Sequence, residues 1–231
     1  MTAHIGIVGC SAEGAALCYR TICAEGEALL GAHDHPEVSL HTLPLARYVM
    51  HLDTGDMEGV GRLMLTSAHK LAAAGADILI CPDNTIHQAM GYVQPRSPRP
   101  WLHIADEVVA EAGRRGFRRL GITGTRWLTD SDVYPASIAR AGLEYVRPGE
   151  DDRHMIDRII MEELVRGRFL PASTAAIGAA IGRLAAQGCD AVVLGCTEIP
   201  LVIDDTNAPL PTLDSTRLLA RAALRHAMAW A

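Results

Sequence analysis

The chain lacks any apolar run that approaches the roughly 20 residues needed by a membrane-spanning helix. It also lacks a basic stripe and any interleaving of basic with aromatic residues, and its formal net charge at pH 7 is −6. We therefore expect neither a membrane nor a nucleic acid as a partner. Hydrophobic residues make up 49% and charged residues 21% of the 231 residues, which is typical of a soluble globular protein.

The six cysteines form no CxxC pair and no compact disulfide framework. The N-terminus has no charged n-region and no apolar h-region, so we expect a cytoplasmic protein with reduced thiols. The spacing of histidine and cysteine predicts no metal site. Residues 9–11 (GCS) do not complete a GxGxxG motif, so no nucleotide cofactor is implied either.

The most informative pattern is an internal repeat. Residues 71–85 read LAAAGADILICPDNT, residues 184–198 read LAAQGCDAVVLGCTE, and the two align without a gap. A second, shorter repeat has almost the same offset: GIVG at residues 6–9 recurs as GITG at 121–124. The repeat indicates two copies of one α/β unit, each of a size that can fold as a domain.

Short runs of Val, Ile and Leu alternate with helical patterns, which is typical of parallel strands buried on both faces. We predict an α/β fold of two pseudo-symmetric, doubly wound parallel-sheet halves with the active site in the cleft between them. The first half comprises residues 1–100 plus 216–231, and the second comprises 101–215. The expected strands are Ile5–Gly9, Val38–Leu43, Asp77–Cys81, Trp101–Ile104, Leu120–Thr123, Leu143–Val146, Ala191–Leu194 and Leu210–Leu213. The expected helices include Met57–Ala76, Asp152–Gly167 and Thr216–Trp230.

Asp83 and Cys196 occupy equivalent positions of the repeat, just past a strand, where parallel sheets bind their ligands. If the halves face each other, the two side chains approach one substrate from opposite sides. That geometry removes a proton from one face of a carbon and returns it to the other. A helix cap is the alternative role for Asp83. Cys81 aligns with Leu194 inside a strand, so we expect a buried thiol there.

Several motifs carry a family resemblance. GCTE at residues 195–198 resembles the second catalytic signature of the aspartate/glutamate racemase superfamily, and DNTIH at 83–87 resembles the first, in which a cysteine normally precedes Asn-Thr. Other stretches that resemble the amino-acid racemase branch are IGIVG at 5–9, LHIAD at 102–106, GTR at 124–126 and ELVRGRF at 163–169. The resemblance covers essentially the whole chain. It implies a cofactor-independent isomerase with two α/β halves, usually a homodimer.

The chain departs from the family pattern at one catalytic position, because Asp83 stands where the first thiol is expected. A carboxylate with an ordinary pKa of about 4 is a weak base for an α-proton, so the Asp/Cys pair is chemically asymmetric. Three functions stay open. The pair can racemise an acidic amino acid (aspartate or glutamate) or a related dicarboxylate. Cys196 can act alone in a one-sided isomerase, decarboxylase or lyase, or the chain can be a non-catalytic carboxylate binder. The intact GCTE motif favours an enzyme.

A carboxylate substrate needs groups that hold its oxygen atoms. Hydroxyl and amide side chains at strand-to-helix turns suit an α-carboxylate, and each is also a candidate cap. These side chains are Ser11, Asn84, Thr85, Thr125 and Thr197. A side-chain carboxylate suits an arginine, and the resemblance implies Arg47 and Arg166, with Arg168 as the alternative to Arg166. We expect Glu198 to orient the cleft or the turn of Cys196.

Overall fold

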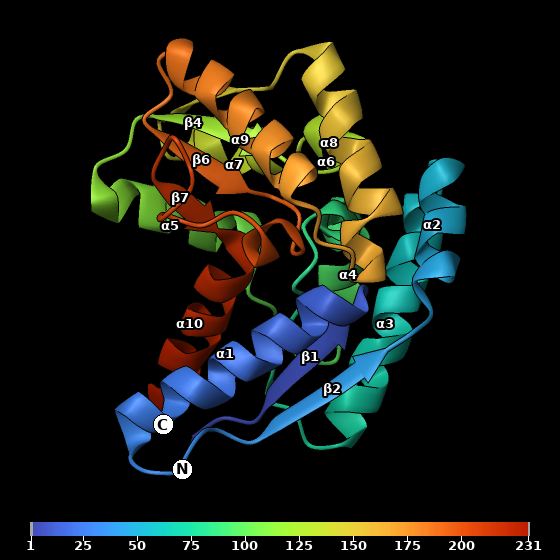
Figure 1. Cartoon of the computed structure of the whole chain (residues 1–231). Coiled ribbons are helices and arrows are strands. Elements are labelled where there is room, and N and C mark those ends of the chain that lie inside the picture. Colours follow the sequence, from blue (N-terminus) through green and yellow to red (C-terminus); the bar gives the residue numbers. More distant parts are fainter. Residues whose placement is uncertain (1, 231) are drawn as a thin grey trace. The chain divides into compact units, whose positions relative to one another are not determined.

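The computed structural model describes residues 2–230. They divide into two compact units, one formed by the residues up to Ile104 together with those from Thr216 on, the other by Ala105–Ser215. Each unit contains one sheet, and all strand pairs within both sheets are parallel (Figure 1). The predicted α/β fold with two parallel-sheet halves is confirmed.

The first unit is built on three strands in the order β2-β1-β3, with Ile7 of β1 paired to Leu40 and to Ile80. Its elements are β1 (Ile5–Gly9), α1 (Ala12–Leu30), β2 (Val38–Thr42), α2 (Leu45–Asp53), α3 (Met57–Ala73), β3 (Ile78–Ile80), the 3₁₀ helix η1 (Thr85–Ala89), α4 (Met90–Val93), the 3₁₀ helix η2 (Gln94–Arg96) and α10 (Ser215–Met228).

Two helices that are far apart in the sequence cover one face of this sheet. Ile5 and Ile7 of β1 belong to one buried cluster with Ile22 of α1 and Leu219 of α10. Figure 1 shows α10 (red) beside α1 (blue), and an ion pair of 2.8 Å joins Arg221 to Glu25 across them. The chain therefore returns at its end to complete the core of the first unit.

The second unit has four strands in the order β5-β4-β6-β7. Its elements are α5 (Ile104–Arg115), β4 (Arg119–Thr123), α6 (Arg126–Thr129), α7 (Val133–Arg140), β5 (Glu144–Val146), α8 (Glu150–Glu162), the 3₁₀ helix η3 (Leu164–Arg166), α9 (Pro171–Ala186), β6 (Ala191–Leu194), the 3₁₀ helix η4 (Ile199–Leu201) and β7 (Thr212–Asp214). Ile159 of α8 and Ile181 of α9 pack with Val192 and Leu194 of β6 in its core.

The repeated residues make the same contact in both units. A Cβ atom added to Gly6 of β1 would lie 3.3 Å from the Leu71 Cβ of α3 and 2.9 Å from the Ala76 Cβ. A Cβ atom added to Gly121 of β4 would lie 3.3 Å from the Leu184 Cβ and 2.8 Å from its Cδ1. In each unit a helix therefore lies so close to the first strand that only glycine fits beneath it.

The remaining repeat residues form the link from this helix to the next strand. Gly75 and Gly188 have φ values of +99° and +85°, which end each helix in a conformation that favours glycine. Asp77 then accepts a hydrogen bond of 2.9 Å from the His4 N–H, and Asp190 accepts one of 3.1 Å from the Arg119 N–H. Each aspartate thus ties its strand to the start of the neighbouring one.

Three details differ from the expectations. Residues 45–53, for which no helix is predicted above, form the helix α2, and their apolar positions at 45, 48, 49 and 52 have the spacing of a helix face. Trp101 makes only an isolated bridge to Leu79 and no strand, because α5 begins at Ile104. The helix expected over Asp152–Gly167 ends at Glu162 and is followed by η3.

We expect Gly121→Ala to lower the free energy of unfolding by about 1–3 kcal/mol, because its methyl group overpacks the contact with Leu184. The matched control is Gly113→Ala in α5, where an added Cβ meets nothing within 4 Å. It should leave the stability unchanged or raise it by up to about 1 kcal/mol. Urea denaturation measures both, and equal effects would contradict the close approach.

Candidate active site

Asp83 lies on the turn between β3 and η1, and its side chain is half-buried. Its Oδ1 accepts a hydrogen bond of 3.2 Å from the Ile86 N–H, so Asp83 caps the 3₁₀ helix. Asn84 and Thr85, which follow it, are buried. The turn therefore presents three of the predicted site residues together, and Cys81 before it is fully buried, as the sequence predicted.

The buried side chain of His87 holds the backbone of this turn in place. Its Nδ1–H donates to the Asp83 carbonyl oxygen at 2.7 Å, and its Nε2 accepts from the Ile104 N–H at 3.3 Å. Its ring meets that of His103 edge to face, with centroids 4.7 Å apart. Burial, followed by the charge of His103, lowers the pKa of His87 to about 3. His87 is thus a neutral structural residue that holds the backbone of Asp83.

Two further predicted residues follow the other strands of the first sheet. Ser11 is the N-cap of α1, and its Oγ accepts from the Gly14 N–H at 3.3 Å. Because β1 pairs with β3, the turns of Ser11 and Asp83 leave the same edge of the sheet. Arg47 lies in the first turn of α2, after β2, and is exposed to solvent.

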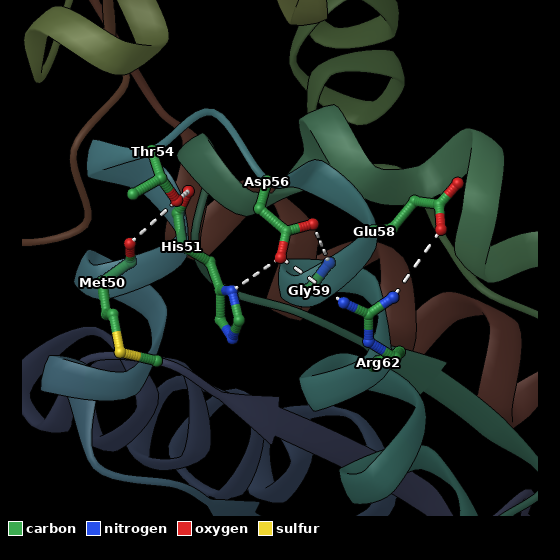
Figure 2. Close-up of polar contacts among 7 residues, drawn as sticks. All are labelled: Met50, His51, Thr54, Asp56, Glu58, Gly59 and Arg62. Carbon is green, nitrogen blue, oxygen red and sulfur yellow. Dashed lines mark hydrogen bonds and ion pairs between the residues drawn. The ribbon is translucent and has the colours of Figure 1, made fainter.

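Polar contacts at the junction of α2 and α3 hold the helix that carries Arg47 (Figure 2). Asp56 caps α3 by accepting a 2.7 Å hydrogen bond from the Gly59 N–H, and its other oxygen pairs with His51 of α2 at 3.0 Å. Arg62 approaches the same oxygen at 3.4 Å. The backbone hydrogen bond, with smaller effects of His51 and Arg62, lowers the pKa of Asp56. The carboxylate thereby fixes the end of α2 against α3.

In the second unit, the turn after β6 pairs a thiol with a carboxylate. The Cys196 Sγ–H donates to Glu198 Oε2 at 2.9 Å, and the Thr197 hydroxyl donates to the same oxygen at 3.3 Å. Cys196 is 7% and Glu198 2% exposed. Among residues 2–230, the Glu198 Oε1 atom has no hydrogen-bond partner. A buried carboxylate next to a thiol is equipped to accept the thiol proton.

Two glycines bring the turns after β4 and β6 together. A Cβ atom on Gly195 would collide with the Thr123 carbonyl oxygen, and one on Gly124 would lie 3.3 Å from the Gly195 carbonyl carbon. Thr125, next to Gly124, caps α6 by accepting from the Leu128 N–H at 3.3 Å. Thr125 and the turn of Cys196 therefore share the carboxyl edge of the second sheet.

The two arginines expected in the second unit lie just after α8. Arg166 belongs to η3, after α8, and Arg168 follows it, so neither comes from a strand-to-helix turn. Both are exposed to solvent. Of the predicted site residues in this unit, the fold groups Thr125, Cys196, Thr197 and Glu198 but does not add an arginine to their turns.

Sequence reasoning placed Glu198 at the site but missed its contact with the Cys196 thiol, which depends on two side-chain rotamers. It also missed the helix α2, in which Tyr48 lies fully buried. The apolar spacing of α2 could have revealed a helix there.

Within residues 2–230, no group of three or more His, Cys, Asp or Glu residues could hold a metal ion. No helix in the described range is long and apolar enough to cross a membrane.

Comparison with known proteins identifies the family. The model of the Asp/Glu/Hydantoin racemase family matches residues 7–223. The chain belongs to this family. The racemase RacX of Bacillus subtilis (strain 168), which has broad specificity for amino acids, is 22% identical over 198 residues, covering 85% of this chain and 84% of the relative.

Solved structures of the racemase family have the same fold. An aspartate racemase homologue from Pyrococcus horikoshii OT3 is 26% identical and has a TM-score of 0.83, covering 98% of this chain and 99% of that one. The glutamate racemase of Aquifex pyrophilus is 16% identical and has a TM-score of 0.62, and the match covers 95% of this chain and 82% of that one. Racemases are isomerases, so membership of this family places the protein among the isomerases.

The lowered pKa of His87 gives a pH dependence with a defined sign. The unfolded chain binds a proton at this histidine below about pH 6.5, whereas the folded protein does so only near pH 3. Stability is therefore fully present above about pH 6.5 and falls as the pH drops toward 3, by up to about 1.4 kcal/mol per pH unit. We expect His87→Asn to show a shallower loss in urea denaturation between pH 6 and pH 4. Parallel curves for both proteins would contradict a neutral, buried His87.

Proposed function

We propose that the protein is a cofactor-independent amino-acid racemase that moves the Cα proton of its substrate between Asp83 and Cys196. The proposed substrate is an acidic amino acid, aspartate or glutamate, or a related dicarboxylate. Family membership supports amino-acid racemisation as the reaction. The repeat supports the pairing, because it puts Asp83 and Cys196 at equivalent turns of two equivalent sheets.

The observation that carries the proposal is the hydrogen bond from the Cys196 thiol to Glu198. Glu198 takes the thiol proton, and the thiolate then removes the proton from one face of Cα. In the reverse direction the thiol returns a proton to that face. A thiol with an ordinary pKa of about 8.5 can serve in both roles near neutral pH, which suits general acid–base catalysis.

Asp83 serves the other face of Cα in this proposal. The Asp83 carboxylate accepts a hydrogen bond from the Ile86 N–H. Such a hydrogen bond favours the ionised form of a carboxyl group. An ionised carboxylate accepts protons more readily than it gives them, so we propose unequal rates in the two directions. This asymmetry also favours a second candidate: a one-sided isomerase, decarboxylase or lyase in which Cys196 alone transfers the proton. Failure of every proton-transfer assay would favour a carboxylate binder.

The turns on the two sheets supply groups for the substrate carboxylates. Ser11, Asn84 and Thr85 line the first sheet's carboxyl edge and Thr125 and Thr197 the second's. The Ser11 hydroxyl accepts one hydrogen bond as a cap, from the Gly14 N–H, and still carries a proton to donate. Arg47, exposed in the first turn of α2, is proposed to bind the side-chain carboxylate, and Arg166 is the second candidate for this role.

We further propose that the protein acts in the cytoplasm as a homodimer without a metal or organic cofactor, which rests on the family resemblance. Sedimentation equilibrium measures the oligomer. Activity that survives exhaustive dialysis against a chelator supports the absence of a metal requirement.

The first test follows hydrogen exchange at Cα by NMR in D₂O with each proteinogenic L-amino acid. The broad specificity of the Bacillus subtilis relative is the reason for testing them all. We expect aspartate or glutamate to exchange fastest. Cys196→Ala should lower that rate by roughly 10²- to 10⁴-fold, the usual contribution of a general acid–base group.

The matched control for this variant is Cys189→Ala, another buried thiol of the same hydrophobic cluster that lies before β6 rather than after it. It creates a similar cavity but should keep the exchange rate. Equal losses in both variants would show that packing, and not the thiol, accounts for the effect. Full activity of Cys196→Ala would overturn the proposed function.

A second test concerns the acid–base role of Asp83. Asp83→Asn keeps an oxygen that can accept the Ile86 N–H but removes the base, so it should stop proton transfer on one face and leave substrate binding largely intact. Asp83→Cys creates a pair of thiols, and we expect it to raise racemisation of aspartate or glutamate because a thiol both gives and takes protons near neutral pH. Chiral chromatography measures the products. If Asp83→Asn keeps full racemisation, Asp83 is only a cap.

A further inference from the structure

His103 lies at the carboxyl edge of the first sheet, just past a segment that runs parallel to β3. In that segment Trp101 bridges to Leu79, and the Leu102 N–H donates to the Leu79 carbonyl oxygen at 3.2 Å. His103 follows directly, as the turn of Asp83 follows the end of β3. The two neighbouring segments are parallel, so His103 leaves the sheet at the same edge as Asp83.

A ring contact also ties His103 to this turn. Its ring lies edge to face against the ring of His87, with centroids 4.7 Å apart and an interplanar angle of 77°. His87 in turn donates to the Asp83 carbonyl oxygen at 2.7 Å. A single buried ring therefore separates His103 from the backbone of Asp83, which agrees with the position that the strand register gives it.

His103 is the ring of this pair that can bind a ligand. His87 is only 3% exposed, and its two nitrogen atoms bind the Asp83 carbonyl oxygen and the Ile104 N–H. The side chain of His103 is half-buried, so part of it is open to solvent. Burial and then the charge of His103 lower the pKa of His87 to about 3, so a positive charge on this pair is carried by His103 at neutral pH.

A substrate carboxylate needs a hydrogen-bond donor at this edge of the sheet. Asp83 is itself a carboxylate, and two like charges held close together in a half-buried site disfavour each other. An imidazole ring has one N–H donor in either neutral tautomer and two when it is protonated. His103 therefore supplies a donor in every form, and its protonation adds a charge that attracts a carboxylate.

We propose that His103 is a substrate-binding residue whose imidazole N–H donates a hydrogen bond to a carboxylate oxygen of the substrate beside Asp83. The inference rests on the proposed function, because it takes an amino acid or a related dicarboxylate as the ligand of this turn. It gives the LHIAD motif at residues 102–106 a role in the reaction, and it adds a nitrogen donor to the hydroxyl and amide groups of the first unit.

Two variants of His103 separate a bond to the substrate from a purely structural ring. His103→Phe keeps an aromatic ring against His87 but has no donor, whereas His103→Gln has an amide N–H donor but no ring. We expect His103→Phe to raise the KM of the best exchange substrate by roughly 10- to 100-fold, the usual effect of losing a hydrogen bond to a charged group. His103→Gln should raise KM by a smaller factor. In both variants kcat should change less than KM, because the bond is made before and during the reaction.

The opposite order of the two variants would show a structural role. If His103→Phe keeps the wild-type KM and His103→Gln does not, the ring only supports His87 and the inference is wrong. A KM that rises only in variants with a lowered urea midpoint would also overturn it.

The matched control is His41→Gln. His41 is likewise half-buried in the first unit, but it lies within β2, and its Nδ1 is 2.9 Å from the Ser67 Oγ. This variant should leave the KM unchanged. An equal rise of KM in His41→Gln and His103→Phe would show a general effect of replacing a histidine, and it would contradict a specific contact of His103 with the substrate.

Succinate serves as an unreactive dicarboxylate probe of the same contact. It should raise the melting temperature of the wild-type protein and raise that of His103→Phe much less. This measurement needs no turnover, so it applies whether or not the protein exchanges a Cα proton.

The outcomes separate this inference from the proposed function. Succinate binding that needs His103, without Cα exchange of any amino acid, would support the inference and overturn the racemase proposal. Exchange with an unchanged KM in His103→Phe would support the racemase and overturn the role of His103. A wild-type protein that neither exchanges amino acids nor binds succinate would overturn both.

Discussion

The close contact between a helix and a glycine of the first strand sets the geometry of each half. Leu71 of α3 lies against Gly6, and Leu184 of α9 lies against Gly121. Each helix then ends at a glycine with positive φ, and the next strand pairs in parallel with the strand beneath the helix. The turns that follow β3 and β6 are therefore placed by this one packing contact, and they carry Asp83 and Cys196.

The equivalence of the two halves ends at these turns. Asp83 is held by backbone groups, since it accepts the Ile86 N–H and its carbonyl accepts from the buried, neutral His87. The Cys196 thiol donates to the carboxylate of Glu198. The first turn thus resembles a helix cap with a carboxylate, and the second resembles an activated thiol. The two turns therefore differ in the residue at the equivalent position of the sequence and also in the groups that these two side chains contact.

Much of the scaffold could be predicted from the sequence, because the repeat directly encodes backbone requirements. The residues Leu71, Gly75 and Asp77 recur as Leu184, Gly188 and Asp190, and each has the same contact or conformation in both units. The hydrophobic periodicity of the sequence predicted the wrong element where tertiary contacts determine the local structure. Trp101 forms a single bridge because no further strand residues follow it before α5 begins.

The candidate site was predictable only in part. The turns could be located, since they follow strands, but their side-chain contacts could not. The pairing of Cys196 with Glu198, two residues apart, depends on rotamers that sequence spacing does not determine.

The most direct test of the proposal that Asp83 and Cys196 serve opposite faces of one carbon uses the wild-type protein in D₂O. The deuterium content of each enantiomer is measured at early times after adding L-aspartate or L-glutamate. We expect deuterium in the newly formed D-enantiomer and very little in the remaining L-enantiomer, because one group removes the proton and a different group delivers deuterium to the other face. Rapid deuteration of the L-enantiomer without any D-enantiomer would contradict the claim and show that Cys196 or Asp83 acts alone.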